Sequence, residues 1–343
     1  MAYKVTFQPV GIEMEVEEGE TILDAAFRQG IALMHGCKEG QCSACKSLLL
    51  DGDIELRDYS TFALPDFEKE EDHILLCRTE AFSDLEVELL QYDEEALKKS
   101  VPIKTFRTTV EEIESLTHDI RRLSLKLVEP KEITFHAGQF VDVYLPGEDV
   151  YRSYSMANPP SQSDRLEFMI KIFHGGKFSD YLDTKIQVGD TLEVRGPFGN
   201  CILNHESTGE ILLVGGGSGM APLWSILNDI VDKGIDRKVT FFYGVRSRRD
   251  LFYLDQFSRM EQRLPNFRFI PALSEPQQED HWNGNTGLIT DVMDRYLSGS
   301  NLSEAEAYLC GPAPMIDTAI PIIQNHGITS DRIFFDKFVP ASN

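Results

Sequence analysis

The sequence predicts a multidomain protein in which a small α+β domain, an antiparallel β-barrel domain and an α/β domain with a parallel sheet follow one another. Three observations predict this order. Residues 1–100 combine short strand patterns with a brief helix and a cysteine-rich loop. Residues 105–200 hold many short strands separated by Gly and Pro turns, which is the pattern of a small antiparallel barrel. From about residue 210, continuous apolar runs alternate with helix patterns, as in a parallel sheet.

The composition excludes several classes of function. The chain has 343 residues, of which 42% are hydrophobic and 26% are charged, as in ordinary globular proteins. A net charge of −23 argues against nucleic acids and anionic membranes as partners, because both are bound through Lys and Arg. No apolar run approaches the roughly 20 residues that span a bilayer, and the first residues show no export signal. Six cysteines are too few for a disulfide scaffold, so we expect a cytoplasmic protein.

The first hundred residues predict a hairpin, a helix and a further strand. Apolar and polar residues alternate over Tyr3–Phe7 and again over Ile12–Val16, which indicates a β-hairpin. Thr21 is a suitable N-cap for the short helix pattern that follows it. Another strand is expected at Ser47–Leu50, and the polar residues 91–100 predict a linker.

Acidic residues are concentrated in the same part of the chain. Residues 1–100 contain 23 Asp and Glu against 9 Lys and Arg. Such charge can steer and orient a basic partner surface. The same charge can also keep the protein soluble, and the charge alone does not distinguish partner binding from solubility.

The cysteine-rich loop has the spacing of an iron–sulfur site. Cys37, Cys42 and Cys45 follow the pattern C-x4-C-x2-C, and Cys77 comes after 31 further residues. This is the plant-type [2Fe–2S] pattern, and small residues in the loop let backbone N–H groups reach the sulfurs. A zinc site normally uses two short cysteine pairs, and a Rieske centre needs two histidines where only His35 is near. Zinc and structural thiols remain the alternatives.

On these cysteines, residues 1–95 resemble plant-type ferredoxin domains, which have the β-grasp fold. The resemblance implies that the four cysteines bind the iron. It also implies that the cluster moves one electron at a time at a low potential.

A possible flavin site begins at the R-x-Y-S motif of residues 152–155. Strand alternation places Arg152 and Tyr154 on one face, where Arg suits a phosphate and Tyr a flat ring. A solvent-facing Arg and a core Tyr would be the plainer explanation. Gly175–Ser179 opens a helical stretch whose N-terminus suits a pyrophosphate. Gly196–Gly199 predicts a tight turn at the end of the barrel.

Together these segments resemble the ferredoxin–NADP reductase superfamily, in which R-x-Y-S binds flavin. The resemblance implies that Arg152 meets a flavin phosphate, that Tyr154 packs on the isoalloxazine and that Ser155 lies near its N5. It further implies that the pyrophosphate of FAD is held by Gly176, Phe178 and Ser179.

The next candidate site is a glycine-rich turn between a strand and a helix. Glycines let a backbone approach a pyrophosphate. The turn departs from the G-x-G-x-x-G pattern because Met220 occupies the third Gly position. In addition, the next strand does not end in an Asp or Glu that could bind the 2′-hydroxyl of the ribose. The turn matches instead the G-G-x-[ST]-G-x-x-P form of the reductase superfamily. The resemblance implies coenzyme binding by Gly216, Gly217, Ser218 and Gly219.

A C-G-P segment follows the third apolar run. Cys310 would otherwise be explained as a small buried hydrophobe. By the resemblance, the turn places Cys310 beside the nicotinamide and flavin N5. The coenzyme is then also contacted by Gly311, Pro312 and Met315. Related enzymes shield the flavin with a C-terminal aromatic residue, for which Phe338 is the candidate, and it would move aside for the nicotinamide.

Three arginines raise the question of which coenzyme is used. Arg246, Arg248 and Arg249 follow the second apolar run, where arginines can bind the 2′-phosphate of NADPH. Asp250 opposes such binding. The sequence favours NADH and leaves NADPH open.

The order of ferredoxin, flavin and nucleotide domains resembles the reductase component of bacterial multicomponent oxygenases. It is most similar to those of soluble di-iron monooxygenases of the phenol, propane and methane types. The resemblance implies electron transfer from NADH through FAD and a 2Fe–2S cluster to a hydroxylase component that docks on the acidic ferredoxin domain. The expected domains are 1–97, 103–206 and 207–343. Alternatives are the reductase of a Rieske dioxygenase, another stand-alone ferredoxin-type reductase, or a non-enzymatic iron–sulfur protein.

Overall fold

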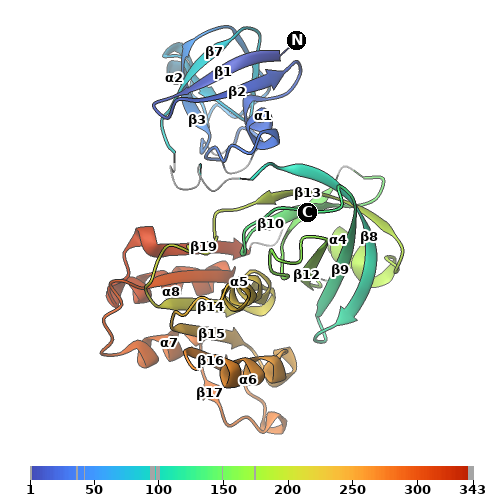
Figure 1. Cartoon of the computed structure of the whole chain (residues 1–343), viewed down its shortest axis with the longest axis vertical. Coiled ribbons are helices and arrows are strands. Elements are labelled where there is room, and N and C mark those ends of the chain that lie inside the picture. The colour runs from blue at the N-terminus through green and yellow to red at the C-terminus, as the bar shows by residue number, and fades with distance from the viewer. Residues whose placement is uncertain are drawn as a thin grey trace. The chain divides into compact units, whose positions relative to one another are not determined.

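The chain forms two compact units, residues 1–104 and 105–343, drawn in Figure 1. The computed structural model describes residues 2–35, 38–41, 43–92, 97, 101–148, 150–173 and 175–338. Most of the predicted linker at 91–100 lies outside these residues. Among the residues that the structure describes, no helix is long and apolar enough to cross a membrane.

The first unit is built on a mixed sheet in the order β2-β1-β7-β3-β5. Its strands are β1 (Ala2–Gln8), β2 (Ile12–Glu17), β3 (Lys46–Asp51), β5 (His73–Leu75) and β7 (Leu85–Leu89). A second sheet pairs β4 (Ile54–Leu56) with β6 (Thr79–Ala81), and the helices are α1 (Ile22–Arg28) and α2 (Asp66–Glu70). Strand β1 is antiparallel to β2 and parallel to β7, so the predicted hairpin and the α+β class are confirmed.

Helix α1 forms where the sequence predicts it. The Oγ1 of Thr21 accepts a hydrogen bond from the N–H of Asp24 at 3.1 Å, which is the expected N-cap. The apolar side of the helix is buried, as are Val5 and Phe7 of the neighbouring sheet. These burials hold the helix against the sheet.

The second unit begins with a six-stranded antiparallel sheet in the order β11-β10-β13-β8-β9-β12. Its strands are β8 (Lys104–Ser115), β9 (Ile120–Glu129), β10 (Phe140–Tyr144), β11 (Tyr151–Ser155), β12 (Arg165–Lys171) and β13 (Thr191–Phe198). Strand β11 also contacts β12, so the two ends of the sheet approach each other as in a barrel. Helix α4 (Lys177–Thr184) follows β12. The turn predicted at Gly196–Gly199 is wrong, because β13 continues to Phe198.

A six-stranded parallel sheet completes this unit in the order β17-β16-β15-β14-β18-β19. Its strands are β14 (Ile211–Gly216), β15 (Val239–Val245), β16 (Phe267–Leu273), β17 (Asn285–Thr286), β18 (Glu306–Pro312) and β19 (Ile333–Phe338). The helices are α5 (Met220–Asp232), α6 (Leu254–Arg263), α7 (Ile289–Leu297) and α8 (Ala313–Asn325). Helices α5 and α6 cover one face, and α7 and α8 cover the other (Figure 1). The predicted α/β class is confirmed.

The strand order creates a crevice between β14 and β18. The chain runs outward from β14 through β15 and β16, then crosses back to lay β18 on the other side of β14. Ligands of such sheets bind outside the carboxyl ends of the strands at this reversal. The barrel is fixed to the same region, because the Oγ of Ser225 in α5 donates to the carbonyl of Asn158 at 2.7 Å.

Candidate cofactor and coenzyme sites

Strand pairing in the first unit brings two of the predicted iron ligands together. Cys45 directly precedes β3 and Cys77 follows β5, and these strands pair so that Lys46 lies opposite Leu75. The Sγ atoms of Cys45 and Cys77 are 3.3 Å apart, and both residues are buried. The hydrogen bond with Cys45, together with burial, raises the pKa of the Cys77 thiol. Two buried sulfurs in contact are a donor set that suits iron.

The loop before Cys45 winds tightly. Lys38, Gly40 and Ser43 all have positive φ angles, of 61°, 69° and 59°. A Cβ on Gly40 would lie 2.9 Å from side-chain atoms of Tyr59 and Arg78, so only glycine fits there. Left-handed backbone of this kind recurs in loops whose N–H groups bind anionic groups, iron–sulfur clusters among them. The other two predicted ligands, Cys37 and Cys42, lie outside the described residues.

The R-x-Y-S motif forms β11, as predicted. Arg152 and Tyr154 are both half-buried on this strand, whereas Ser155 at its end is buried opposite Phe140. The ring of Tyr154 lies 5.0 Å from that of Phe178, measured between centroids, and burial raises the pKa of its hydroxyl. The structure therefore joins the two predicted flavin segments through an aromatic contact.

The start of α4 has the form of an anion site. Gly176 is its N-cap, and the Oγ of Ser179 accepts a hydrogen bond from the N–H of Phe173 at 3.0 Å. Because that oxygen is the acceptor, the hydroxyl hydrogen of Ser179 stays able to donate. A helix N-terminus with such a donor fits the pyrophosphate of FAD. Arg152, which donates to the carbonyl of Tyr151 at 2.8 Å, supplies a positive charge on β11.

Two motifs that are about ninety residues apart in the sequence meet at the crevice of the parallel sheet. A Cβ on Gly219 would lie 2.0 Å from the carbonyl oxygen of Cys310, and one on Gly216 would lie 3.0 Å from the Sδ of Met315. Gly311 has a φ of +143°, and a Cβ there would lie 3.0 Å from the Gly216 carbonyl. Glycine is thus required for the turns to pack together.

The middle of the glycine-rich turn faces open space. A Cβ on Gly217 would meet no heavy atom of the described residues within 4 Å, and Ser218 beside it is half-buried. The hydroxyl of Tyr243, in the neighbouring strand β15, donates a hydrogen bond to the Gly217 carbonyl at 2.8 Å and so fixes the position of the turn. An open backbone at the start of α5 fits the pyrophosphate of a nucleotide.

Cys310 has a neighbour that sequence reasoning missed. The Sγ atoms of Cys310 and Cys201 are 3.8 Å apart in the core between the barrel and the sheet. Burial, followed by the hydrogen bond with Cys201, raises the pKa of the Cys310 thiol well above its ordinary value. Cys310 is therefore a neutral thiol. The two cysteines are 109 positions apart, and no pattern in the sequence predicts their contact.

The C-terminal strand brings Phe338 to the same crevice. In the pairing of β18 with β19, Pro312 lies opposite Phe338 and Cys310 lies opposite Asp336. Phe338 is half-buried at the end of the strand. Burial raises the pKa of the Asp336 carboxyl to about 6. Asp336 is a second residue that sequence reasoning missed, although its position two residues before Phe338 puts both on one face of the strand.

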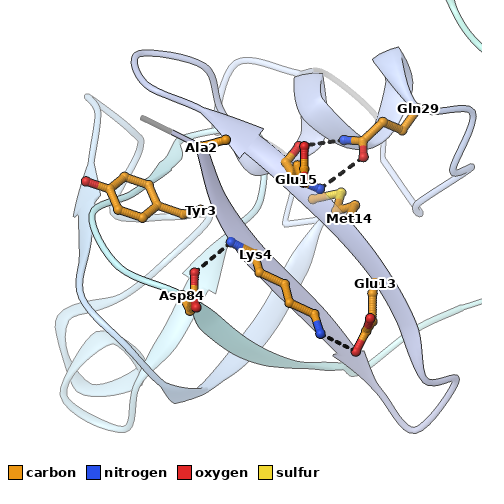
Figure 2. Close-up of a pocket in the computed structure, with 8 residues that line it drawn as sticks. All are labelled: Ala2, Tyr3, Lys4, Glu13, Met14, Glu15, Gln29 and Asp84. Atoms are coloured by element: carbon orange, nitrogen blue, oxygen red, sulfur yellow. Dashed lines mark hydrogen bonds and ion pairs between the residues drawn. The ribbon is translucent and has the colours of Figure 1, made fainter.

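A surface hollow of about 460 Å³ on the first unit carries none of these groups. Figure 2 shows that Lys4, Glu13, Glu15, Gln29 and Asp84, which line it, bind one another. The backbone N–H of Lys4 donates to Asp84 at 2.8 Å, the Nζ of Lys4 pairs with Glu13, and Glu15 and Gln29 exchange hydrogen bonds.

Three family models match successive parts of the chain. They describe a 2Fe–2S iron–sulfur cluster binding domain at residues 5–81, an oxidoreductase FAD-binding domain at 107–202 and an oxidoreductase NAD-binding domain at 213–320. The matched ranges contain the cysteine loop, the R-x-Y-S strand and the glycine-rich turn respectively.

Similar proteins match over the whole length. The propane 2-monooxygenase reductase component of Mycolicibacterium goodii is 46% identical over 98% of this chain and 97% of its own length. The phenol 2-monooxygenase reductase component of Pseudomonas sp. (strain CF600) is 35% identical over 100% of this chain and 96% of its own length. The solved cytochrome P450 reductase GcoB from Amycolatopsis is 29% identical with a TM-score of 0.85, covering 99% of this chain and 100% of its own. The chain therefore belongs to the reductase components of multicomponent oxygenases, as an NAD(P)H-dependent oxidoreductase with FAD and a 2Fe–2S cluster.

Proposed function

We propose that this reductase takes electrons from NADH and delivers them to the hydroxylase component of a soluble di-iron monooxygenase, which docks on the first unit. The observation that carries the proposal is the full-length identity of 46% with a propane 2-monooxygenase reductase component, in a chain that also has the three sites in order. We assign the domains to residues 1–97, 103–206 and 207–343. The three matched family ranges fall within these bounds.

The residues predicted to bind the coenzyme and FAD would have the following roles in this reaction. Gly216, Gly217, Ser218 and Gly219 would bind the coenzyme pyrophosphate, with Gly311, Pro312 and Met315 closing the crevice from β18 and α8. Arg152, Gly176, Phe178 and Ser179 would hold the phosphates of FAD, while Tyr154 and Ser155 line its ring. Cys310, neutral and buried, would keep water from the reacting atoms, and Phe338 would cover the ring until the nicotinamide arrives. When bound, FAD accepts a hydride and releases electrons singly, which suits a cluster that accepts one electron at a time.

The cysteine loop lies beside a face that fits a protein partner. The Oγ of Ser43, between the predicted ligands, donates to the carbonyl of Ala63 at 3.0 Å. The adjacent Phe62 is 87% exposed, and Phe67 in α2 is 63% exposed. Asp66 and Glu68 flank Phe67 in helix α2, which also carries Lys69. Exposed aromatic residues among carboxylates favour docking of a basic surface close to the cluster.

Reconstitution tests the proposed partner. The full-length reductase is combined anaerobically with purified hydroxylases of the propane and phenol types and with a Rieske dioxygenase, and product formation from NADH is measured after oxygen is admitted. We expect product with a di-iron hydroxylase. Product with the Rieske enzyme alone would overturn the di-iron assignment.

Two variants test the docking face. Phe62→Ala should lower electron transfer to the hydroxylase about tenfold or more, because an exposed aromatic anchor is lost. Phe82→Ala is the matched control, since Phe82 is 52% exposed on the same unit but bonds to Asp53 rather than to the cysteine loop. Reduction of ferricyanide should be unchanged in both variants. Equal losses in the two variants would argue against this face.

A further inference from the structure

A cluster of charged side chains joins the barrel to the end of β15. His118 and Asp119 come from the turn between β8 and β9. Arg246 and Asp250 come from the segment that follows β15. The Nη2 of Arg246 lies 3.8 Å from the Oδ2 of Asp119 and 4.0 Å from the Oδ1 of Asp250. One guanidinium thus faces two carboxylates, one from each part of the unit.

Asp119 is held firmly in this position. Its Oδ2 is 2.9 Å from the Nζ of Lys171, and its Oδ1 accepts a hydrogen bond from the hydroxyl of Thr117 at 3.0 Å. Burial opposes ionisation, but the Lys171 ammonium outweighs it and holds the pKa of Asp119 below its usual value. Asp119 is therefore charged at neutral pH.

Asp250 is fixed in the same way by its own turn. Its Oδ2 accepts hydrogen bonds from both the N–H and the hydroxyl of Ser247, each at 2.9 Å. Its other oxygen faces Arg246 and, at 3.6 Å, the Nδ1 of His118. The carboxylates cannot turn away from Arg246 without breaking these bonds.

The cluster is an ion-pair network and not a metal site. One ligand atom each from His118, Asp119 and Asp250 lie within 4.8 Å of one another, which is close enough for a cation. Asp119, however, already faces Lys171 and Arg246. Two positive side chains at the same oxygen would repel a metal ion.

The network lies where the adenosine end of the coenzyme is expected. Strand β15 neighbours β14, and Gly244 pairs with Gly216 of the glycine-rich turn. The hydroxyl of Tyr243 reaches Gly217 at 2.8 Å. In nucleotide-binding sheets, the end of the second strand meets the adenosine ribose, and an arginine there accommodates the 2′-phosphate of NADPH. Arg246 occupies that position.

Two of the three arginines that could bind such a phosphate already have partners, and the third, Arg249, is exposed. Arg246 faces the two carboxylates, and the guanidinium of Arg248 donates to the carbonyl of Asp280 at 2.8 Å. A 2′-phosphate, with a charge of about −1.5 to −2, would have to pair with Arg246 while the carboxylates of Asp119 and Asp250 face the same guanidinium and repel the phosphate. A ribose hydroxyl carries no such charge.

We propose that Asp119, a residue of the barrel, is a specificity-determining residue for the coenzyme. Together with Asp250 it neutralises Arg246, so that the site selects NADH against NADPH. The inference rests on the proposed use of NADH, and it assigns the selection to the domain that binds FAD rather than to the nucleotide domain alone.

The test compares Asp119→Asn with Asp164→Asn in the full-length holoenzyme. Asp164 bonds to Lys126 and Arg165 at the opposite end of the same β9–β12 ladder, so its substitution removes an equivalent paired charge. Initial rates with ferricyanide give kcat/KM for NADH and for NADPH without any hydroxylase. We expect Asp119→Asn to raise kcat/KM for NADPH about tenfold, mostly through KM, and to change that for NADH less than about twofold. Asp164→Asn should change neither.

A second measurement identifies the residue that receives the phosphate. Adenosine 2′,5′-bisphosphate and 5′-AMP are titrated into each variant by calorimetry, which does not depend on turnover. Asp119→Asn should bind the bisphosphate about tenfold more tightly, and the added substitution Arg246→Gln should remove that gain. FAD content and the visible spectrum confirm that each variant is intact.

Other outcomes would overturn the inference. A wild-type preference for NADPH, equal changes in Asp119→Asn and Asp164→Asn, or equal losses with both coenzymes would each do so. A gain that survives Arg246→Gln would also contradict the assigned mechanism. None of these results bears on the proposed partner, which is tested by product formation with a hydroxylase.

Discussion

At the scale of single residues, the carboxyl end of the parallel sheet combines a neutral thiol, a protonatable carboxyl and an aromatic ring. Cys310 and Asp336 face each other across β18 and β19, and Phe338 follows on the same strand. Both Cys310 and Asp336 have raised pKa values because burial disfavours their charged forms. The Cys310 thiol is therefore uncharged at neutral pH, whereas the Asp336 carboxyl becomes protonated only as the pH falls toward 6.

The partly buried carboxyl of Asp336 makes the stability of the protein depend on pH. Its folded pKa of about 6 exceeds the ordinary value of 3.8, so between these pH values the folded chain holds a proton that the unfolded chain has released. The free energy of unfolding therefore falls as pH rises through this window. Asp336→Asn should be more stable than the wild type at pH 7, by at most about 3 kcal/mol, and equal to it near pH 4.

Thermal unfolding of both proteins, followed by the release of flavin fluorescence between pH 4 and pH 8, measures this difference. FAD content is the control for intact folding. A difference between the two proteins that does not vary with pH would show that the Asp336 carboxyl is not buried as described.

Phe338 should control access to the flavin. Because it ends β19 opposite Pro312, we expect Phe338→Ala to uncover the site and to change KM for NADH and NADPH about threefold or more. Phe335→Ala, in the same strand but 47% exposed, is the matched control. Unchanged kinetics with both coenzymes would remove Phe338 from the site.

At the scale of elements, the glycine-rich turn and the C-G-P turn act as one structure. Gly219→Ala would place a methyl group 2.0 Å from the Cys310 carbonyl, so one of the two turns must move. We expect coenzyme binding to weaken about tenfold or more, while FAD and iron contents stay normal. Gly234→Ala is the control for a strained glycine substitution away from the two turns, because Gly234 has a φ of +62° at the surface and a Cβ there would meet no described heavy atom within 4 Å. Spectroscopic titration with NAD⁺ measures the affinity of both variants. Normal affinity in Gly219→Ala would contradict this packing.

The sequence predicts elements well where the signal is local. The hairpin predicted over Tyr3–Phe7 and Ile12–Val16 forms as β1 and β2, and the cap at Thr21 is confirmed. The turn at Gly196–Gly199 is wrong because Gly and Pro normally indicate turns, yet here strand pairing continues to Phe198.

The contacts that the sequence could not predict are long-range. The pair of Cys201 with Cys310, and the approach of Asp119 to Arg246, depend on how the barrel packs against the sheet. Periodicity describes which face of a strand is buried, and it carries no information about which distant element covers that face. The motifs could be identified from their resemblance to a family, whereas the residues that contact these motifs became known only from the packing of the domains.

At the scale of the whole molecule, acidic charge is greatest in the first hundred residues. Transfer to the hydroxylase should slow as ionic strength rises from about 0.01 M to about 0.5 M, because the Debye length falls well below 10 Å at the higher value. Reduction of the cluster by NADH within the chain, followed by stopped-flow absorbance, should change far less and serves as the internal control. A transfer rate that is flat across this range would show that charge does not guide docking.

The central claim is that a nucleotide site, a flavin site and an iron–sulfur site act in series within one chain. The most direct measurement is a visible spectrum of the purified full-length protein before and after anaerobic addition of NADH, with metal and flavin assays. We predict about two iron atoms and about one FAD per chain, and loss of both the flavin and the cluster absorbance on reduction. A colourless protein, a protein that holds zinc instead of iron, or a coloured protein that NADH does not reduce would contradict the account.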